Sequence, residues 1–288
     1  MSASIEVTPA EATPRPRHRR WPATLVTGAI LLSAVAVIGL LSLVWLPFDL
    51  ADTSGGRLES PGATHWLGTD TLGRDTASFV LVGTRIALTV GLGSTVIAVI
   101  LGLVIGLVSA HSSGWLDDVQ SSLLDVLIAF PTLLLAMLIG ATQGASLSTA
   151  VISIGIAASA IVARLTRILA KRLLRQQFVV AAHTSGTGWF QIIVRHLLPN
   201  MWPTLVVAAA LVFGSAVLAE ASLSYLGLGV PPPNASLGRL LRESQATVLG
   251  APWSAIAPGV VIVMIVLSAN FLADGLREHF DPTRRGRS

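Results

Sequence analysis

The chain has no cysteine, a single lysine and few charged residues, and each shortage excludes a class of function. Without cysteine there is no disulfide, no thiolate metal site and no cysteine nucleophile. The phosphate-binding loop of P-loop ATPases needs a lysine after a glycine and before a serine or threonine. The only lysine, Lys171, lies between Ala170 and Arg172, so the chain cannot hydrolyse ATP by that route.

Charged residues make up only 12% of the 288 residues, whereas hydrophobic residues make up 52%. An ordinary soluble domain is about one-quarter charged, so we expect lipid to surround much of this chain. The formal net charge of +4 would also fit a nucleic-acid-binding protein. We reject that class because the basic residues lie beside apolar stretches, as they do in membrane proteins.

Six apolar stretches are candidates for crossing a bilayer, which takes about 20 residues. They are Trp21–Trp45, Ile86–Ala110, Leu123–Ala141, Thr149–Val162 (extended back to about Ser146), Trp202–Leu218 and Ala255–Leu272. The first is too long for the apolar part of a signal peptide, which has about 7–15 residues, and no A-x-A site closes it. The sequence therefore predicts an all-α membrane protein with six transmembrane helices.

Glycine is frequent in these stretches, and Gly102 and Gly106 form a GxxxG pair in the second. Small residues let helix backbones approach closely in lipid. We expect this pair to pack against another helix of the same chain rather than to form a dimer seam.

Fourteen of the 19 lysine and arginine residues fall in three segments, 1–20, 164–200 and 276–288. Cytoplasmic loops of membrane proteins carry such an excess of basic residues. With six spans, both termini and the segment 164–200 then lie in the cytoplasm, and the loops after the first and fifth spans face outward. We therefore predict a multi-pass protein of the cytoplasmic membrane.

The basic segment Arg164–Asn200 has the pattern of two amphipathic helices joined at Gly186, since glycine readily takes the left-handed conformation that ends a helix. We expect the second of these helices to end at Pro199. Ala181 and Ala182 offer a small, smooth surface near the glycine. From the pattern alone, docking onto a partner protein and lying on anionic lipid headgroups are equally open.

Residues for catalysis or metal binding do not form a recognisable pattern. The H-E-x-x-H and G-x-S-x-G motifs are absent, and the six histidines do not stand at ligand spacing. We expect no catalytic residue, no metal and no cofactor. Asp125 and Glu220 fall near the ends of spans, and no acid falls at a predicted midplane, which argues against an ion-driven transporter.

Several motifs resemble those of bacterial ABC importer permeases. The pattern A-A-x3-G-x9-H-x-L-P, from Ala181 to Pro199, resembles the coupling loop of that family. Four further features resemble the dipeptide, oligopeptide and nickel branch of that family. They are His65–Asp75 (HWLGTDTLGRD), Glu220–Val230 (EASLSYLGLGV), Ala273–Pro282 (ADGLREHFDP), and Asp125 with Phe130–Pro131. The resemblance covers about residues 65–282.

The resemblance implies a type I ABC importer transmembrane domain that forms half of a path for dipeptides or oligopeptides. It implies a second homologous permease, two ATP-binding subunits that hydrolyse ATP, and an extracytoplasmic solute-binding protein. Alternatives are import of nickel chelates, haem or another small solute by the same mechanism, or, less favoured, an ion-coupled secondary transporter. No nucleic acid is implied as a partner.

Composition, apolar runs and basic residues also divide the chain. They predict a disordered cytoplasmic tail (1–20), a first transmembrane helix (21–47), a periplasmic loop (48–84), a five-helix permease core (85–275) and a cytoplasmic tail (276–288). The resemblance implies that residues 164–200 of this core are the coupling loop. The expected ATPase-coupling residues are Ala181, Ala182, His183, Thr184, Ser185, Gly186, Thr187 and Gly188. Family members often have acids where this chain has Gln177 and Val180, which weakens ionic contacts there.

Two outer segments are candidates for a periplasmic gate or for contact with the binding protein. Their residues are Gly68, Asp70, Gly73, Arg74, Asp75, Tyr225, Gly227 and Gly229. The alternative for the first segment is an ordinary structured turn, and for the second a loop that folds onto the helices for stability.

Overall fold

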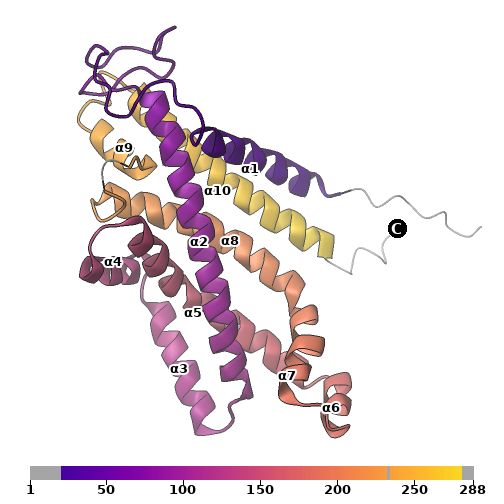
Figure 1. Cartoon of the computed structure of the whole chain (residues 1–288). Coiled ribbons are helices and arrows are strands. Elements are labelled where there is room, and N and C mark those ends of the chain that lie inside the picture. The colour runs from indigo at the N-terminus through magenta and orange to yellow at the C-terminus, as the bar shows by residue number, and fades with distance from the viewer. Residues whose placement is uncertain (1–20, 232–233, 281–288) are drawn as a thin grey trace, which may run out of the picture.

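The computed structural model describes residues 21–231 and 234–280, and the described residues form a bundle of helices (Figure 1). In chain order they are α1 (Ala23–Leu41), α2 (Thr76–His111), α3 (Trp115–Ala129), α4 (Thr132–Gln143), α5 (Leu147–Leu174), α6 (Gln177–Thr184), α7 (Trp189–Ile192), the π-helical turn η1 (Ile193–Leu197), α8 (Leu198–Tyr225), α9 (Leu237–Ser244) and α10 (Trp253–Phe280). The all-α prediction is confirmed for this part of the chain. The predicted tail 1–20 lies outside it, as do residues 281–288 of the predicted tail 276–288, whereas residues 276–280 continue α10.

Five helices are each long and apolar enough to cross a membrane, and a bent pair makes up to six. The five are α1, α2, α5, the continuous helix Trp189–Tyr225 and α10. The third predicted span, Leu123–Ala141, is not one helix. α3 and α4 meet at 87°, because Phe130 before Pro131 is extended, with φ −73° and ψ 129°.

Other helix boundaries also differ from the sequence prediction. α2 begins at Thr76, ten residues before the predicted start, because Asp75 caps it by accepting a hydrogen bond from the Ser78 N–H. α5 continues to Leu174, so the first third of the basic segment is part of a long helix. Basic side chains do not end a helix, and near its C-terminus they favour it.

The helix break expected at Pro199 is wrong. α7, η1 and α8 follow one another without interruption, and Pro199 is the second residue of α8. In the π-helical turn the Leu198 N–H donates to the Ile193 oxygen five residues back. This shift in hydrogen bonding accommodates a proline that has no N–H of its own.

Close helix packing at small residues builds the centre of the bundle. A Cβ atom on Gly102 would lie 2.5 Å from Val162 Cβ, and one on Gly106 would lie 2.5 Å from Thr166 Cβ. The GxxxG pair of α2 therefore packs against α5 of the same chain, as predicted. α1 meets α10 in the same way, since a Cβ on Gly275 would lie 2.4 Å from the Leu25 backbone.

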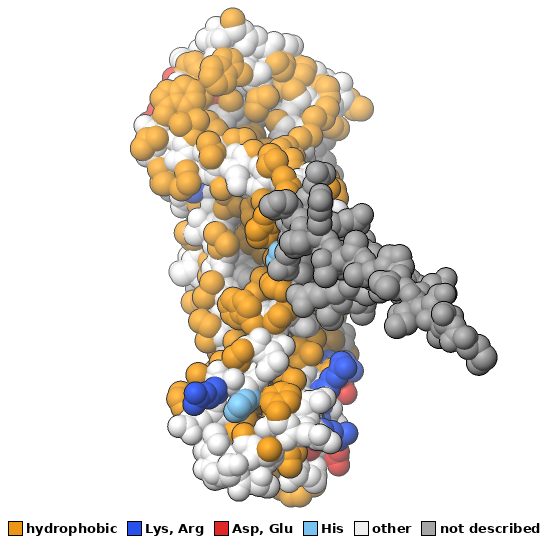
Figure 2. Space-filling view, turned by 90° about the vertical axis from the view of Figure 1, so that its right-hand side faces the viewer, with side chains coloured by type: hydrophobic (Ala, Val, Ile, Leu, Met, Phe, Trp, Pro, Cys, Tyr) orange, Lys and Arg blue, Asp and Glu red, His pale blue; other side chains and the backbone are white. Residues whose placement is uncertain are grey.

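The two ends of the bundle are different (Figure 1). At one end, which we name the loop end, lie the irregular residues 42–75 and α9. At the other, the hairpin end, α6 and α7 extend beyond the long helices. Figure 2 shows hydrophobic side chains over much of one face, with lysine and arginine side chains gathered toward the hairpin end.

Candidate functional site

The hairpin of α6 and α7 owes its turn to one glycine. Gly186 has φ +82°, in the left-handed region, and an added Cβ would meet no atom within 4 Å. The Thr187 N–H donates to the Ala182 oxygen at 3.1 Å, and the Gly186 N–H to the His183 oxygen at 3.0 Å. This pair of bonds is the Schellman motif. The predicted helix break is confirmed, and its cause is backbone conformation rather than crowding.

Buried aliphatic side chains hold the hairpin against the long helices. Val179 of α6 and Ile192 of α7 are buried in a cluster with residues of α2, α5 and α8. Two ring contacts add to this: His111 to Trp189, with centroids 4.4 Å apart, and Phe178 to His196, with centroids 6.0 Å apart. The hairpin is therefore packed directly against three long helices.

The tip of the hairpin is accessible. Ala181, His183, Thr184, Ser185, Gly186 and Gly188 are exposed, and Ala182 and Thr187 are partly so. Four large apolar side chains around the tip are also exposed: Phe178 (45%), Val180 (49%), Phe190 (76%) and Val194 (47%). The structure thus brings all eight predicted coupling residues together on one projection with an apolar surface beside them.

Ion pairs use part of the positive charge near the hairpin to hold α3 against α5. Asp117 accepts a hydrogen bond from Arg167 at 2.6 Å and also pairs with Lys171. Asp125 pairs with Arg164 at 3.1 Å. Arg172, Arg175 and Arg195 stay exposed. The only lysine of the chain therefore has a structural partner, and the exposed arginines leave the hairpin base positively charged.

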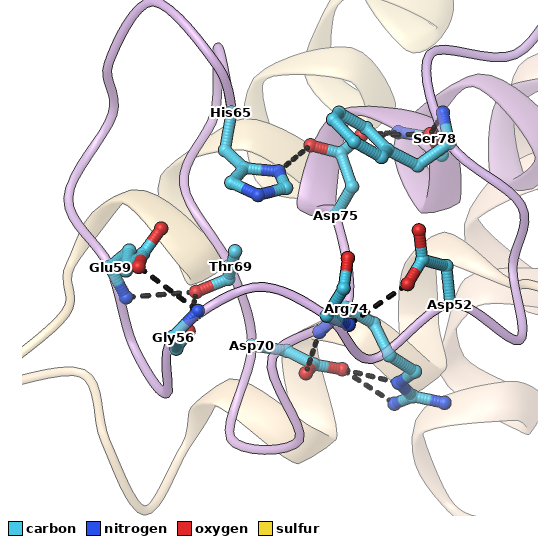
Figure 3. A network of polar contacts seen from close by, with 11 residues as sticks. Asp52, Gly56, Glu59, His65, Thr69, Asp70, Arg74, Asp75 and Ser78 are labelled. Atoms are coloured by element: carbon cyan, nitrogen blue, oxygen red, sulfur yellow. Dashed lines mark hydrogen bonds and ion pairs between the residues drawn. The ribbon is translucent and has the colours of Figure 1, made fainter.

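At the loop end, the predicted segment His65–Asp75 forms a tightly bonded turn (Figure 3). Asp75 is buried, and its carboxylate accepts hydrogen bonds from the N–H and the hydroxyl of Ser78, both at 2.8 Å. Its other oxygen lies 3.0 Å from His65 Nδ1. These bonds join the loop to the first turn of α2.

A second set of bonds joins the same turn to α9. Asp70 accepts from Arg74 Nε at 2.7 Å, and Arg74 also reaches Glu243 of α9 at 3.4 Å. Gly68 and Gly73 have φ of +69° and +79°, as a tight turn requires. All five predicted residues of this segment thus take part in a structured turn.

Near this turn, hydrogen bonds from the Ser54 hydroxyl and N–H lower the pKa of Asp52.

The second outer segment closes the end of α8 onto α9. Glu220 is buried and accepts hydrogen bonds from Ser224 and Ser236, both at 2.8 Å. The Tyr225 hydroxyl donates to Gln245 at 2.9 Å. Gly227 has φ +88°, and a Cβ on Gly229 would overlap the Ser224 hydroxyl. The predicted residues Tyr225, Gly227 and Gly229 therefore lie together at the loop end.

Helix α9 contributes residues that sequence reasoning assigned to no site. Glu243 accepts from Arg239 at 2.7 Å as well as from Arg74. Arg239 and Glu243 stand four residues apart, a spacing that stabilises helices. That spacing was the available indication of a helix in the outer loop.

A groove of about 300 Å³ runs between α4, α5 and α8. Its lining is largely aliphatic, with hydroxyl-bearing residues Thr132, Ser215 and Ser222 and no charged residue. The groove can therefore contact a solute without recognising a particular charge.

In the described ranges 21–231 and 234–280, no three His, Asp or Glu side chains are grouped as metal ligands would be.

Comparison with known proteins gives consistent matches. Residues 98–286 match the family described as the binding-protein-dependent transport system inner membrane component. The chain is similar to the dipeptide transport system permease protein DppC of Alkalihalophilus pseudofirmus, at 36% identity over 89% of this chain and 85% of that protein. It is also similar to the glutathione transport system permease protein GsiD of Pectobacterium atrosepticum, at 37% identity over 78% of this chain and 74% of that one. A putative peptide permease protein of Brucella suis is 35% identical over 89% and 86% of the two chains.

Proposed function

The chain belongs to the family of binding-protein-dependent transport system inner membrane components, and from that membership we propose that it is the permease subunit of an ATP-driven peptide importer. It forms half of the translocation path for dipeptides or oligopeptides across the cytoplasmic membrane. Three relatives named for dipeptide, peptide or glutathione transport support this cargo class. The groove between α4, α5 and α8 lines the translocation path on the side formed by this subunit.

The exposed hairpin is the observation that carries the proposal. Ala181–Gly188 stands beyond the membrane-spanning helices, is rigidly joined to them, and exposes both small and apolar residues. An exposed apolar surface of this kind is typical of a contact site for another protein, because it is more stable in a protein groove than in water. We assign it to a separate ATP-binding subunit, because the chain's only lysine, Lys171, is not in a phosphate-binding loop.

The continuous helix from Trp189 to Tyr225 supports a mechanical route for the coupling. Its first residues belong to the hairpin, and its last residues lie beside α9 at the loop end. When two ATP-binding subunits close on ATP, the hairpins move and these helices tilt, which exposes the path alternately to the two sides. A second homologous permease completes the path.

The charge distribution supports one orientation. The hairpin end carries the exposed arginines Arg172, Arg175 and Arg195, and cytoplasmic segments carry such an excess. We therefore place the hairpin and both termini in the cytoplasm and the loop end outside, where a solute-binding protein delivers cargo. There the turn containing Gly68, Asp70, Gly73, Arg74 and Asp75 serves as a firm platform for that protein. Tyr225, Gly227 and Gly229 line the outer gate.

Other cargoes are possible within the same mechanism. The uncharged groove suits a nickel chelate, haem or another small solute as well as a peptide, since it selects by no charge. An ion-coupled secondary transporter is the less favoured alternative. It predicts uptake by this chain alone, driven by an ion gradient, whereas our proposal predicts none.

Replacement of Gly186 by valine tests the coupling role. The left-handed φ disfavours a β-branched residue, so the hairpin tip changes shape while the long helices are untouched. In the reconstituted complex we expect peptide uptake to fall at least about tenfold, as a loss of about 1.4 kcal/mol of coupling would give. The amount of inserted chain, measured by immunoblot of membranes, stays unchanged.

Gly114→Val is the matched control. Gly114 also has positive φ (+63°) and open space around a Cβ, but it lies between α2 and α3, outside the hairpin. Normal uptake with Gly186→Val, or equal loss with both variants, would count against a coupling role for the hairpin.

A further inference from the structure

A cavity of about 280 Å³ lies at the loop end, apart from the groove between α4, α5 and α8. Three segments line it: Ala145 before α5, residues between Ser224 in the last turn of α8 and Pro231 beyond it, and Arg239, Arg242 and Glu243 of α9. Ligand pockets usually measure about 300–1,000 Å³. The cavity is therefore large enough for one end of a small molecule, and it carries two arginines.

The charges around the cavity do not balance. Glu243 is paired with both Arg239 and Arg74, and Asp70 is paired with Arg74. Among the described residues, no carboxylate lies within ion-pair distance of Arg242. Of the two arginines that line the cavity, Arg239 is therefore paired and Arg242 is not.

The backbone beside Arg242 leaves room for its guanidinium. Arg242 Nη1 lies only 2.5 Å from the position that a Cβ on Gly227 would take. A side chain at residue 227 would therefore push the guanidinium away. Glycine there keeps the charged group against the loop and within the lining of the cavity.

We infer that Arg242 binds a carboxylate of the cargo as it enters from outside. The inference rests on the proposed peptide import, and it assigns the free C-terminal carboxylate of a short peptide to this cavity. Guanidinium groups bind carboxylates through two parallel, charge-assisted hydrogen bonds. Glu243 lies in the same lining but is already paired with Arg74 and Arg239, so it leaves the charge of Arg242 available to a carboxylate.

The shape of the site favours cargo over an acidic side chain of the binding protein. Arg242 lines a recess between three segments rather than a projection. The end of a small, freely diffusing molecule enters a recess of this volume more easily than a side chain fixed on a protein surface does. Loss of Arg242 would weaken docking of the binding protein if its partner were an acidic side chain of that protein, but not if its partner were the cargo. One set of variants therefore separates the two.

The test uses the complete importer with its binding protein, reconstituted in liposomes. We compare Arg242→Gln, Arg242→Lys and the control Arg57→Gln, which removes an exposed arginine at the same end that does not line the cavity. We measure uptake of a dipeptide and of its C-terminal amide, and binding of the cargo-loaded binding protein to each complex.

We expect Arg242→Gln to lower dipeptide uptake about 10- to 100-fold, the effect of losing a charged hydrogen-bond donor. Arg242→Lys keeps part of the uptake, Arg57→Gln keeps all of it, and uptake of the amide changes less than twofold with any variant. Binding-protein docking is unchanged. Equal losses for dipeptide and amide, weaker docking of the binding protein, or full uptake by Arg242→Gln would overturn the inference. If the wild-type complex imports no peptide, the proposed function fails and this inference fails with it.

Discussion

Asp75 shows how much one residue contributes at the loop end. Its carboxylate caps α2 through the Ser78 N–H, accepts the Ser78 hydroxyl and contacts His65. Alanine at this position removes all three interactions and leaves buried donors without partners. We expect Asp75→Ala to lower the free energy of unfolding by about 1–3 kcal/mol. Thermal unfolding in detergent measures the effect.

Asp49→Ala is the control for that prediction. Asp49 accepts one hydrogen bond from the Ala51 N–H in an exposed turn, so its loss changes stability little. Equal melting temperatures for Asp75→Ala and the wild-type protein would show that the bonded turn does not stabilise the loop end.

Single residues differed in how well the sequence predicted them. The helix break at Gly186 was predicted correctly, because the short connection between α6 and α7 requires a residue in the left-handed backbone conformation. Asp75 was a candidate for a periplasmic gate or for binding-protein contact, with a structured turn as the alternative, and it was not expected to begin α2. Its hydrogen bond from the Ser78 N–H is also typical of an ordinary turn. Arg242 was missed because one arginine in a segment expected to be an outer loop belongs to no sequence motif, although the structure places it in α9. Its significance depends on which acids already have partners in the folded chain.

At the scale of elements, the contact of α1 with α10 depends on glycine at residue 275. A Cβ there would lie 2.4 Å from the backbone of Leu25, so a larger side chain must push the two helices apart. We expect Gly275→Leu to destabilise the protein by about 1–3 kcal/mol or more, as overpacking does. It also exposes α1 to added protease before the rest of the chain.

Gly259→Leu is the matched control in the same helix. A Cβ at residue 259 would meet only the Leu241 side chain, at 3.9 Å, so α10 accommodates it. If both leucine variants resist protease as the wild-type chain does, the close contact of α1 with α10 is not needed for stability.

Elements were predicted best where apolar residues run without interruption. α1, α2, α5, α8 and α10 all appear near their expected places. The bend between α3 and α4 was missed because apolar composition continues through Phe130–Pro131, although proline restricts the residue before it. At Pro199 the sequence instead predicted a helix end that is absent. The π-helical turn η1 accommodates the proline, which has no N–H to donate, and the helix continues. In both cases the local effect of a proline on the backbone, rather than hydropathy, decided the outcome.

At the scale of the whole molecule, the chain joins two surfaces of different character. The loop end is a bonded turn packed on α9, and the hairpin end is an exposed projection on α6 and α7 (Figure 1). The helix from Trp189 to Tyr225 connects the two. A subunit built in this way suits the transfer of movement between partners on opposite sides of a membrane. We propose that the hairpin end faces the cytoplasm and contacts the ATP-binding subunit there.

Site-specific crosslinking tests this placement of the hairpin end. Since the chain has no cysteine, Ser185→Cys at the exposed hairpin tip and Ser60→Cys in the exposed outer loop each introduce a single thiol. In native membranes that contain the partner subunits, a thiol-directed crosslinker should join Ser185→Cys, and not Ser60→Cys, to an ATP-binding subunit. On intact cells, a membrane-impermeant maleimide should label only Ser60→Cys. No crosslink from Ser185→Cys to an ATP-binding subunit, or labelling of Ser185→Cys from outside, would show that the hairpin end does not meet an ATP-binding subunit in the cytoplasm.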